Sequence, residues 1–270
     1  MGVRFHLAWL LLAYAVCPLR ADPSLDLGYR EMYSRQFAEA HQTFAQFEKK
    51  NPADAMGPVS DAAAYLFGEF ERLRILQSQF FVSNTSFFGF HRPNADPKVK
   101  QEFESALGRA KALANSTLEK SPANEDALLA ETLRFGLEAN YLALIEKKNI
   151  AALNEIKDGR AAAQKLLAAH PDCYDAYLAA GVENYLLSQK SAPVRWLLDL
   201  TGSQTDKNEG IKNLRIVADK GRYLHPYAKL LLAIAALRDG NKANARQLLS
   251  WLSARFPQNS LYKEELKKIK

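Results

Sequence analysis

The stretch that decides the fold is LDLGYREMYSRQFAEAHQTFAQFEKKNP, residues 25–52. Its apolar and small residues recur at helical intervals on both sides of a polar break at residues 34–36. This spacing predicts two amphipathic helices joined by a short turn. Since a proline cannot continue a helix, the second helix is expected to end before Pro52. Residues 25–52 therefore predict a helical hairpin.

The same closing phrase occurs three more times, where an apolar helical pattern ends in Pro122, Pro171 and Pro257. Such self-similarity predicts helical hairpins stacked along the chain, as in repeat solenoids. Successive closing prolines are 70, 49 and 86 residues apart, so insertions break the period. Because strand signals are nearly absent, the predicted fold class is all-α.

The first and last hairpins resemble the tetratricopeptide-repeat (TPR) family, whose motif of 34 residues places small and bulky side chains at fixed positions. The matching residues are Leu27, Gly28, Phe37, Ala40, Phe44, Phe47 and Pro52 in the first hairpin, and Ala233, Gly240, Ala245, Leu249, Leu252 and Pro257 in the last. The resemblance implies a TPR-like α-solenoid over residues 22–270, a right-handed superhelix of antiparallel helical hairpins with irregular insertions. Gly28 and Ala40 are expected to let two helices approach closely while Phe44 fills the space beside them.

Further helices are expected elsewhere in the chain. Residues 226–238 and 242–255 form the last hairpin, and residues 260–270 form a polar closing helix. The middle of the chain is expected to contribute helices over residues 99–120, 125–147, 150–169 and 209–221. Gly221 is expected to stop the last of these as a C-terminal cap.

Residues 1–21 have the pattern of a cleaved secretory signal peptide, with Arg4 before an apolar run over 7–16 and an exit at Ala21. The apolar run is too short to span a bilayer, so a permanent anchor is the weaker alternative. Lipoprotein anchoring at Cys17 is not expected, because Val16 stands where a lipoprotein signal has a small residue. The mature chain, residues 22–270, is expected in the bacterial periplasm or cell envelope.

Composition describes a folded chain with no obvious nucleic-acid partner. Apolar and aromatic residues make up 48% and charged residues 24%, which is ordinary globular usage. The formal charge of +6 is mild, and export argues against nucleic acid. Without residues 1–21 only Cys173 remains, so no intramolecular disulfide is expected.

No catalytic signature is found, so the chain is expected not to be an enzyme and to need no cofactor or metal. Phosphate loops, zinc motifs and nucleophile elbows are absent from the sequence. His170 with Asp172 and Cys173 could form a metal or nucleophile cluster, but a helix terminus explains them more simply. Glu138 and Glu183 could act as acid or base, although a surface or structural role is the simpler interpretation.

The resemblance places ligand contacts on the first helix of each hairpin, facing the inside of the superhelix. Carried over to this chain, these residues are Tyr29, Met32, Tyr33, Leu133, Leu137, Tyr141, Val182, Tyr185, Ile234 and Arg238. Such an aromatic and apolar face suits an extended or helical peptide. The alternative for each residue is a place in the core between hairpins.

Two insertions interrupt the hairpin rhythm. Residues 80–90 contain five Phe, and residues 192–202 contain Trp196 among several Leu. Phe87, Phe88, Phe90 and Trp196 are candidate contacts to a partner, and packing as a plug inside the solenoid is the alternative. Membrane association is the less favoured use of the Phe-rich stretch, and the oligomeric state is left open.

Two functions follow from these patterns. The leading hypothesis is a non-catalytic scaffold of the bacterial cell envelope that binds a protein or peptide partner along a concave groove. The alternative is an enzyme or small-ligand-binding protein that uses the solenoid as a frame, with a pocket closed by the two insertions.

Overall fold

The computed structural model describes residues 23–75, 94–188 and 206–269. Within these ranges all regular structure is helical, with no strand, which confirms the predicted all-α fold class. The helices are α1 (Pro23–Tyr33), α2 (Phe37–Lys50), α3 (Met56–Arg72), α6 (Pro97–Lys120), α7 (Glu125–Asn140), α8 (Asn149–Ala169), α9 (Tyr177–Ser188), α11 (Lys207–Lys220), α12 (His225–Arg238), α13 (Lys242–Arg255) and α14 (Ser260–Lys268). A π-helical turn, η1 (Tyr141–Glu146), follows α7, and a short 3-10 turn, η2 (Tyr174–Ala176), precedes α9.

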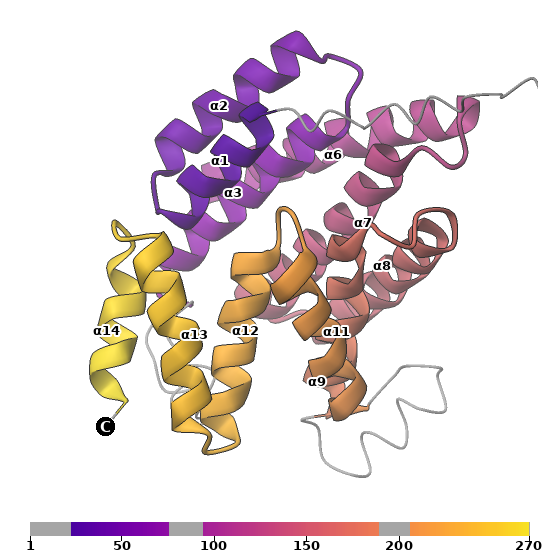
Figure 1. Ribbon diagram of the computed structural model, residues 1–270. Helices are drawn as coiled ribbons and strands as arrows, with labels where there is room; N and C mark the ends of the chain where they lie inside the picture. The colour runs from indigo at the N-terminus through magenta and orange to yellow at the C-terminus, as the bar shows by residue number, and fades with distance from the viewer. Residues whose placement is uncertain (1–22, 76–93, 189–205, 270) are drawn as a thin grey trace, which may run out of the picture.

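Each helix packs mainly on its neighbours along the chain, from α1 on α2 through to α13 on α14. Figure 1 shows them following one another around the molecule, with α12–α14 coming back towards α1 and α3. One side of several of these helices faces a common interior. The predicted signal peptide and both predicted insertions lie outside the described residues. None of the helices that the structure describes is long and apolar enough to cross a membrane.

The first hairpin forms where residues 25–52 predict it. Helix α1 ends at Tyr33 and α2 begins at Phe37, on either side of the predicted break. A Cβ added to Gly28 would lie 2.3 Å from Cε1 of Phe44, whose side chain is fully buried. Only glycine therefore allows the two helices to pack this closely around the phenylalanine.

The last hairpin also matches its prediction. Helices α12 and α13 have the expected bounds to within one residue, and Gly240 makes the turn between them with φ of +74°. A left-handed conformation of this kind favours glycine. Helix α14 closes the array where a polar helix was predicted.

The middle of the chain follows the predicted helices with two differences. The helix predicted over 125–147 is α-helical only to Asn140, after which η1 winds more widely. Gly221 follows α11 as predicted, but its φ is −60°, so left-handed freedom is not the reason for a glycine. A Cβ there would lie 2.6 Å from Oδ1 of Asp175, and this close approach requires the glycine.

The two ends of the described array touch each other. The Tyr33 hydroxyl donates to the Tyr223 carbonyl at 3.1 Å, and the Asn259 amide donates to the Tyr33 carbonyl at 2.9 Å. The rings of Tyr29 and Tyr223 stack at 4.8 Å between centroids. Arg222 adds a two-pronged contact to Asp26 at 3.0 and 2.9 Å. These contacts join residues about 200 apart in sequence and close the helical array on itself.

Candidate functional site

An apolar cavity of about 160 Å³ lies in the middle of the array, and we call it the inner cavity. Its walls are the inward faces of α1, α3, α7, α8, α9 and α12. It is lined by eight of the ten inner-face residues predicted from the sequence: Tyr29, Met32, Tyr33, Leu133, Leu137, Val182, Ile234 and Arg238. The repeat pattern thus identifies side chains from four helices that line one common cavity.

The other two predicted residues differ. Tyr141 is absent from the cavity wall and stacks on Phe103, with 4.9 Å between ring centroids. Tyr141 is eight residues after Leu133. Eight residues of α-helix turn about 80° more than two full turns, so the two side chains point in different directions. Tyr185 belongs to α9, and its side chain lies outside the described part of the chain. Phe87, Phe88, Phe90 and Trp196 lie outside it too.

Closure of the array buries the aromatic residues of α1 deeply. Tyr29 and Tyr33 are each 4% exposed, and Ile234 is 3% exposed. The Tyr29 hydroxyl accepts a hydrogen bond from Ser60 Oγ at 3.1 Å, and burial raises the pKa of both tyrosines. These phenols therefore stay neutral at neutral pH, and their rings form part of the cavity wall.

Asp175 is a buried carboxylate on the inner cavity that the sequence analysis missed. It accepts hydrogen bonds from the backbone N–H groups of Arg222, Tyr223 and Leu224 at 3.1, 3.0 and 3.0 Å. Burial raises the pKa of Asp175, and the three donors oppose that rise. Asp175 therefore fixes the turn that carries Tyr223 to the first hairpin. No local motif marks such a long-range acceptor.

Two further lining groups were also missed. Glu155 of α8 faces the inner cavity, where burial, and next the charge of Glu138, raises its pKa. Gly136 of α7 lines the cavity too, and a Cβ added there would meet no atom within 4 Å. The helical periodicity of α7 could have placed Gly136 beside Leu133 and Leu137.

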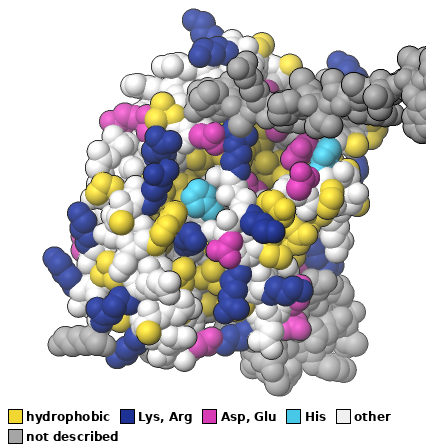
Figure 2. All heavy atoms as spheres, viewed as in Figure 1, with side chains coloured by type: hydrophobic (Ala, Val, Ile, Leu, Met, Phe, Trp, Pro, Cys, Tyr) yellow, Lys and Arg dark blue, Asp and Glu magenta, His cyan; other side chains and the backbone are white. Residues whose placement is uncertain are grey.

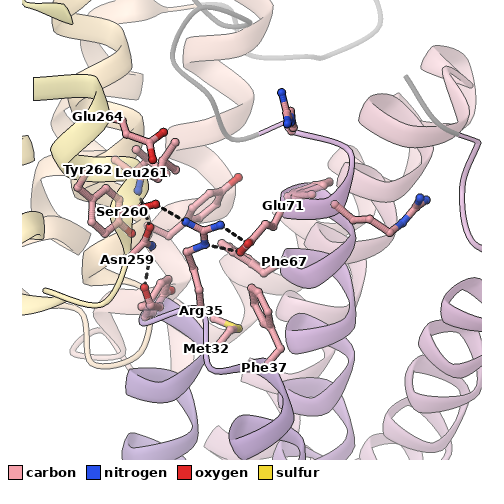
Figure 3. Close-up of a pocket in the computed structure, with 16 residues that line it drawn as sticks. Met32, Arg35, Phe37, Phe67, Glu71, Asn259, Ser260, Leu261, Tyr262 and Glu264 are labelled. Carbon is pink, nitrogen blue, oxygen red and sulfur yellow. Dashed lines mark hydrogen bonds and ion pairs between the residues drawn. The ribbon is translucent and has the colours of Figure 1, made fainter. Parts of the chain in front are cut away.

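A second cavity, of about 450 Å³, lies beside the inner one, and we call it the outer cavity. The two share five wall residues: Met32, Tyr33, Phe67, Phe70 and Tyr227. Figure 3 shows Arg35 in the centre of the outer cavity, between Glu71 of α3 and Ser260 of α14. Aromatic walls and a positioned ion pair therefore adjoin the apolar interior.

The polar residues singled out for chemistry lie outside both cavities. Glu183 is fully buried and pairs with Arg160, with 3.5 Å between Oε2 and Nε. His170 ends α8 and pairs with Glu125 at 3.6 Å. In the described ranges no three His, Cys, Asp or Glu side chains are grouped so that they could hold a metal ion.

Another histidine is paired on the outer side of the first hairpin. His41 Nδ1 lies 2.5 Å from Oδ1 of Asp61, and its ring packs on Tyr65 with 4.1 Å between centroids. The sequence analysis raised no role for this pair, which lines neither cavity.

Figure 2 shows basic, acidic and apolar side chains interspersed over the face towards the viewer.

Both cavities are defined by the residues of this chain alone. A comparison with protein-family models and with curated proteins finds no match to this chain.

Proposed function

We propose that the chain is a non-catalytic binding protein, and that its concave face takes the apolar part of a small amphipathic ligand. The observation that supports this most is that eight inner-face residues, predicted from the repeat, line one apolar cavity. Pockets for small molecules are usually concave, mainly apolar and provided with a few placed polar groups.

The volumes limit what the ligand can be. The inner cavity, about 160 Å³, is close to the roughly 150 Å³ at which an apolar protein cavity takes up benzene. It suits an apolar group of a few carbons rather than a whole drug-sized molecule. The outer cavity, about 450 Å³, lies within the roughly 300–1,000 Å³ of ordinary ligand pockets. A ligand with a polar part in the outer cavity and an apolar part directed inward fits both.

A protein or peptide partner in the cell envelope is the second candidate. An extended peptide could reach Tyr29, Tyr33 and Ile234 only if the contacts that close the array opened, because these residues are at most 4% exposed. The outer cavity favours a more limited version, in which one anchoring side chain of a partner enters its aromatic walls. The TPR-like superhelix and export through residues 1–21 remain parts of this proposal.

Gly136 offers a direct test, because leucine there would project into the inner cavity without a clash at Cβ. Isothermal titration with 1-decanol measures binding of an apolar chain. We expect Gly136→Leu to weaken decanol binding at least about tenfold, or about 1.4 kcal/mol. Replacing a helix glycine should leave the fold as stable as before or more so.

The matched control is Gly108→Leu. Gly108 lies in α6, also has no atom within 4 Å of an added Cβ, and lines neither cavity. This variant should bind decanol as the wild type does while gaining the same helix propensity. Equal decanol binding by both variants, or no binding by the wild type, would remove the inner cavity as the site.

A further inference from the structure

Arg35 lines the outer cavity with part of its hydrogen-bonding capacity unused. It stands in the α1–α2 turn with φ of 66°, and its Nε donates to Oε2 of Glu71 at 2.6 Å. Nη2 donates to the other oxygen of Glu71, and Nη1 donates to Ser260 Oγ at 2.8 Å. A guanidinium carries five N–H groups, so two of them point to no partner among the described residues.

The charges that line the outer cavity nearly balance. The cavity is lined by three arginines, Arg35, Arg72 and Arg74, against two glutamates, Glu71 and Glu264. Arg72 is already bound to the buried carboxylate of Glu69, with both contacts at 2.7 Å. Arg74 is exposed, and its backbone N–H donates to the Glu71 carbonyl at 2.8 Å. With Arg72 compensated by Glu69, Arg35 and Arg74 balance Glu71 and Glu264, so it is the spare N–H groups of Arg35, and not an excess of positive charge, that favour a negative group there.

The remaining walls complete an amphipathic site. Ser260 Oγ accepts from Arg35, so its own proton is free to be donated to an anion. Phe37, Phe67 and Phe70 line the same cavity, and the last two also line the inner one. Figure 3 shows Phe37 and Phe67 near Arg35, and the wall residues Phe67 and Phe70 continue the apolar surface into the inner cavity.

We infer that the ligand is a monocarboxylate with an apolar chain. Its carboxylate accepts hydrogen bonds from the two remaining N–H groups of Arg35 and from the Ser260 hydroxyl, while its chain lies against Phe67 and Phe70. The planar guanidinium suits this role because its fork of donors matches the two oxygens of a carboxylate. The inference rests on the proposed function, since it assigns the polar end of the same ligand.

The test compares three probes with the same ten-carbon chain: decanoate, decylammonium and 1-decanol. Titration calorimetry on the wild-type protein at neutral pH and low salt should give decanoate about tenfold tighter binding than decylammonium, with 1-decanol between them. Equal affinities, or tighter binding of decylammonium, would contradict a carboxylate headgroup but leave the proposed function intact. Binding of none of the three overturns the proposed function and this inference with it.

Two substitutions locate the headgroup. Glu71→Gln removes the carboxylate that competes for Arg35, so decanoate should bind several-fold tighter and decanol as before. Arg35→Lys keeps the charge but loses the fork, so decanoate binding should weaken several-fold. Arg30→Lys, on the exposed side of α1 and outside both cavities, is the control and should change neither probe. An unchanged decanoate affinity in both Glu71→Gln and Arg35→Lys places the headgroup elsewhere and overturns the assignment.

Discussion

The inner and outer cavities share five wall residues but arise in different ways. Most of the inner wall comes from one inward stripe on each of several helices, repeated around the array. The polar part of the outer wall combines Arg35, Glu71 and Ser260, which come from three segments far apart in sequence. The repeat therefore makes the apolar cavity, while closure of the array makes the polar one. Four predictions test this difference.

The largest effect is expected when the hairpin packing beneath both cavities is removed. Phe44 is fully buried against Gly28, so Phe44→Ala should lower the free energy of unfolding by about 3–5 kcal/mol, measured by urea denaturation. Trp251→Ala is the control, because that side chain is 38% exposed and should cost much less. Similar losses in the two variants would contradict the packing role of Phe44.

The next effect separates the closing turn from the repeat. Asp175→Ala leaves the N–H groups of Arg222, Tyr223 and Leu224 without their acceptor. We expect a loss of at least about 2 kcal/mol in the free energy of unfolding, because buried unsatisfied donors are costly. In Asp175→Ala, amide hydrogen exchange should speed up, relative to the wild type, more at residues 222–224 than in helices α7 and α8. An equal change in exchange in both regions would contradict the claim that Asp175 acts only on the turn that closes the array.

A smaller effect follows from Tyr33, which lines both cavities. Tyr33→Phe keeps the ring but removes the hydrogen bond to the Tyr223 carbonyl, at a cost of about 1 kcal/mol. Tyr227→Phe keeps its ring in both walls as well, and no hydrogen bond of its hydroxyl to the described residues is lost. Urea midpoints should therefore fall for Tyr33→Phe and stay near the wild-type value for Tyr227→Phe.

The smallest effect is a dependence on pH. Since the pKa of Asp175 is raised in the folded state, that state holds the proton more tightly than the unfolded chain does. The contribution of Asp175 to the free energy of unfolding is therefore greatest below its ordinary pKa of about 4 and falls as pH rises through the raised value. Asp175→Asn cannot titrate. The stability difference between the two proteins, measured from pH 3.5 to 7, should shift in favour of the variant as pH rises, and a shift the other way would contradict this direction.

Much of the fold could be predicted because the signals are local. Glycine, alanine and proline at repeat intervals in residues 25–52 set the first hairpin, and helical periodicity set the bounds of α12 and α13 within a residue. The same helical periodicity identifies which residues on the first helix of each hairpin face the interior. For this reason Tyr29, Val182 and Ile234, which are distant in sequence, were all placed on one interior face.

The rest depends on contacts that no local pattern encodes. Arg35 in isolation is only a turn residue, and its meeting with Glu71 and Ser260 depends on how far the array curves. Asp175 likewise acts on a turn almost 50 residues ahead of it. Tyr141 lies off the wall of the inner cavity because two steps of four residues drift around a helix, and because the helix changes to a π-turn there. Closure and curvature are global properties of the array, and a single repeat does not fix them.

The central claim is that the closed array binds an apolar chain in its interior, with the polar end at Arg35. A crystal structure of the wild-type protein with 10-bromodecanoate tests it most directly, because the bromine gives an anomalous peak at the end of the chain. The account predicts that peak in the inner cavity, near Leu133, Gly136 and Val182, with the carboxylate at Arg35 in the outer cavity. A peak on the outer surface of the helices, with both cavities unchanged, would contradict it.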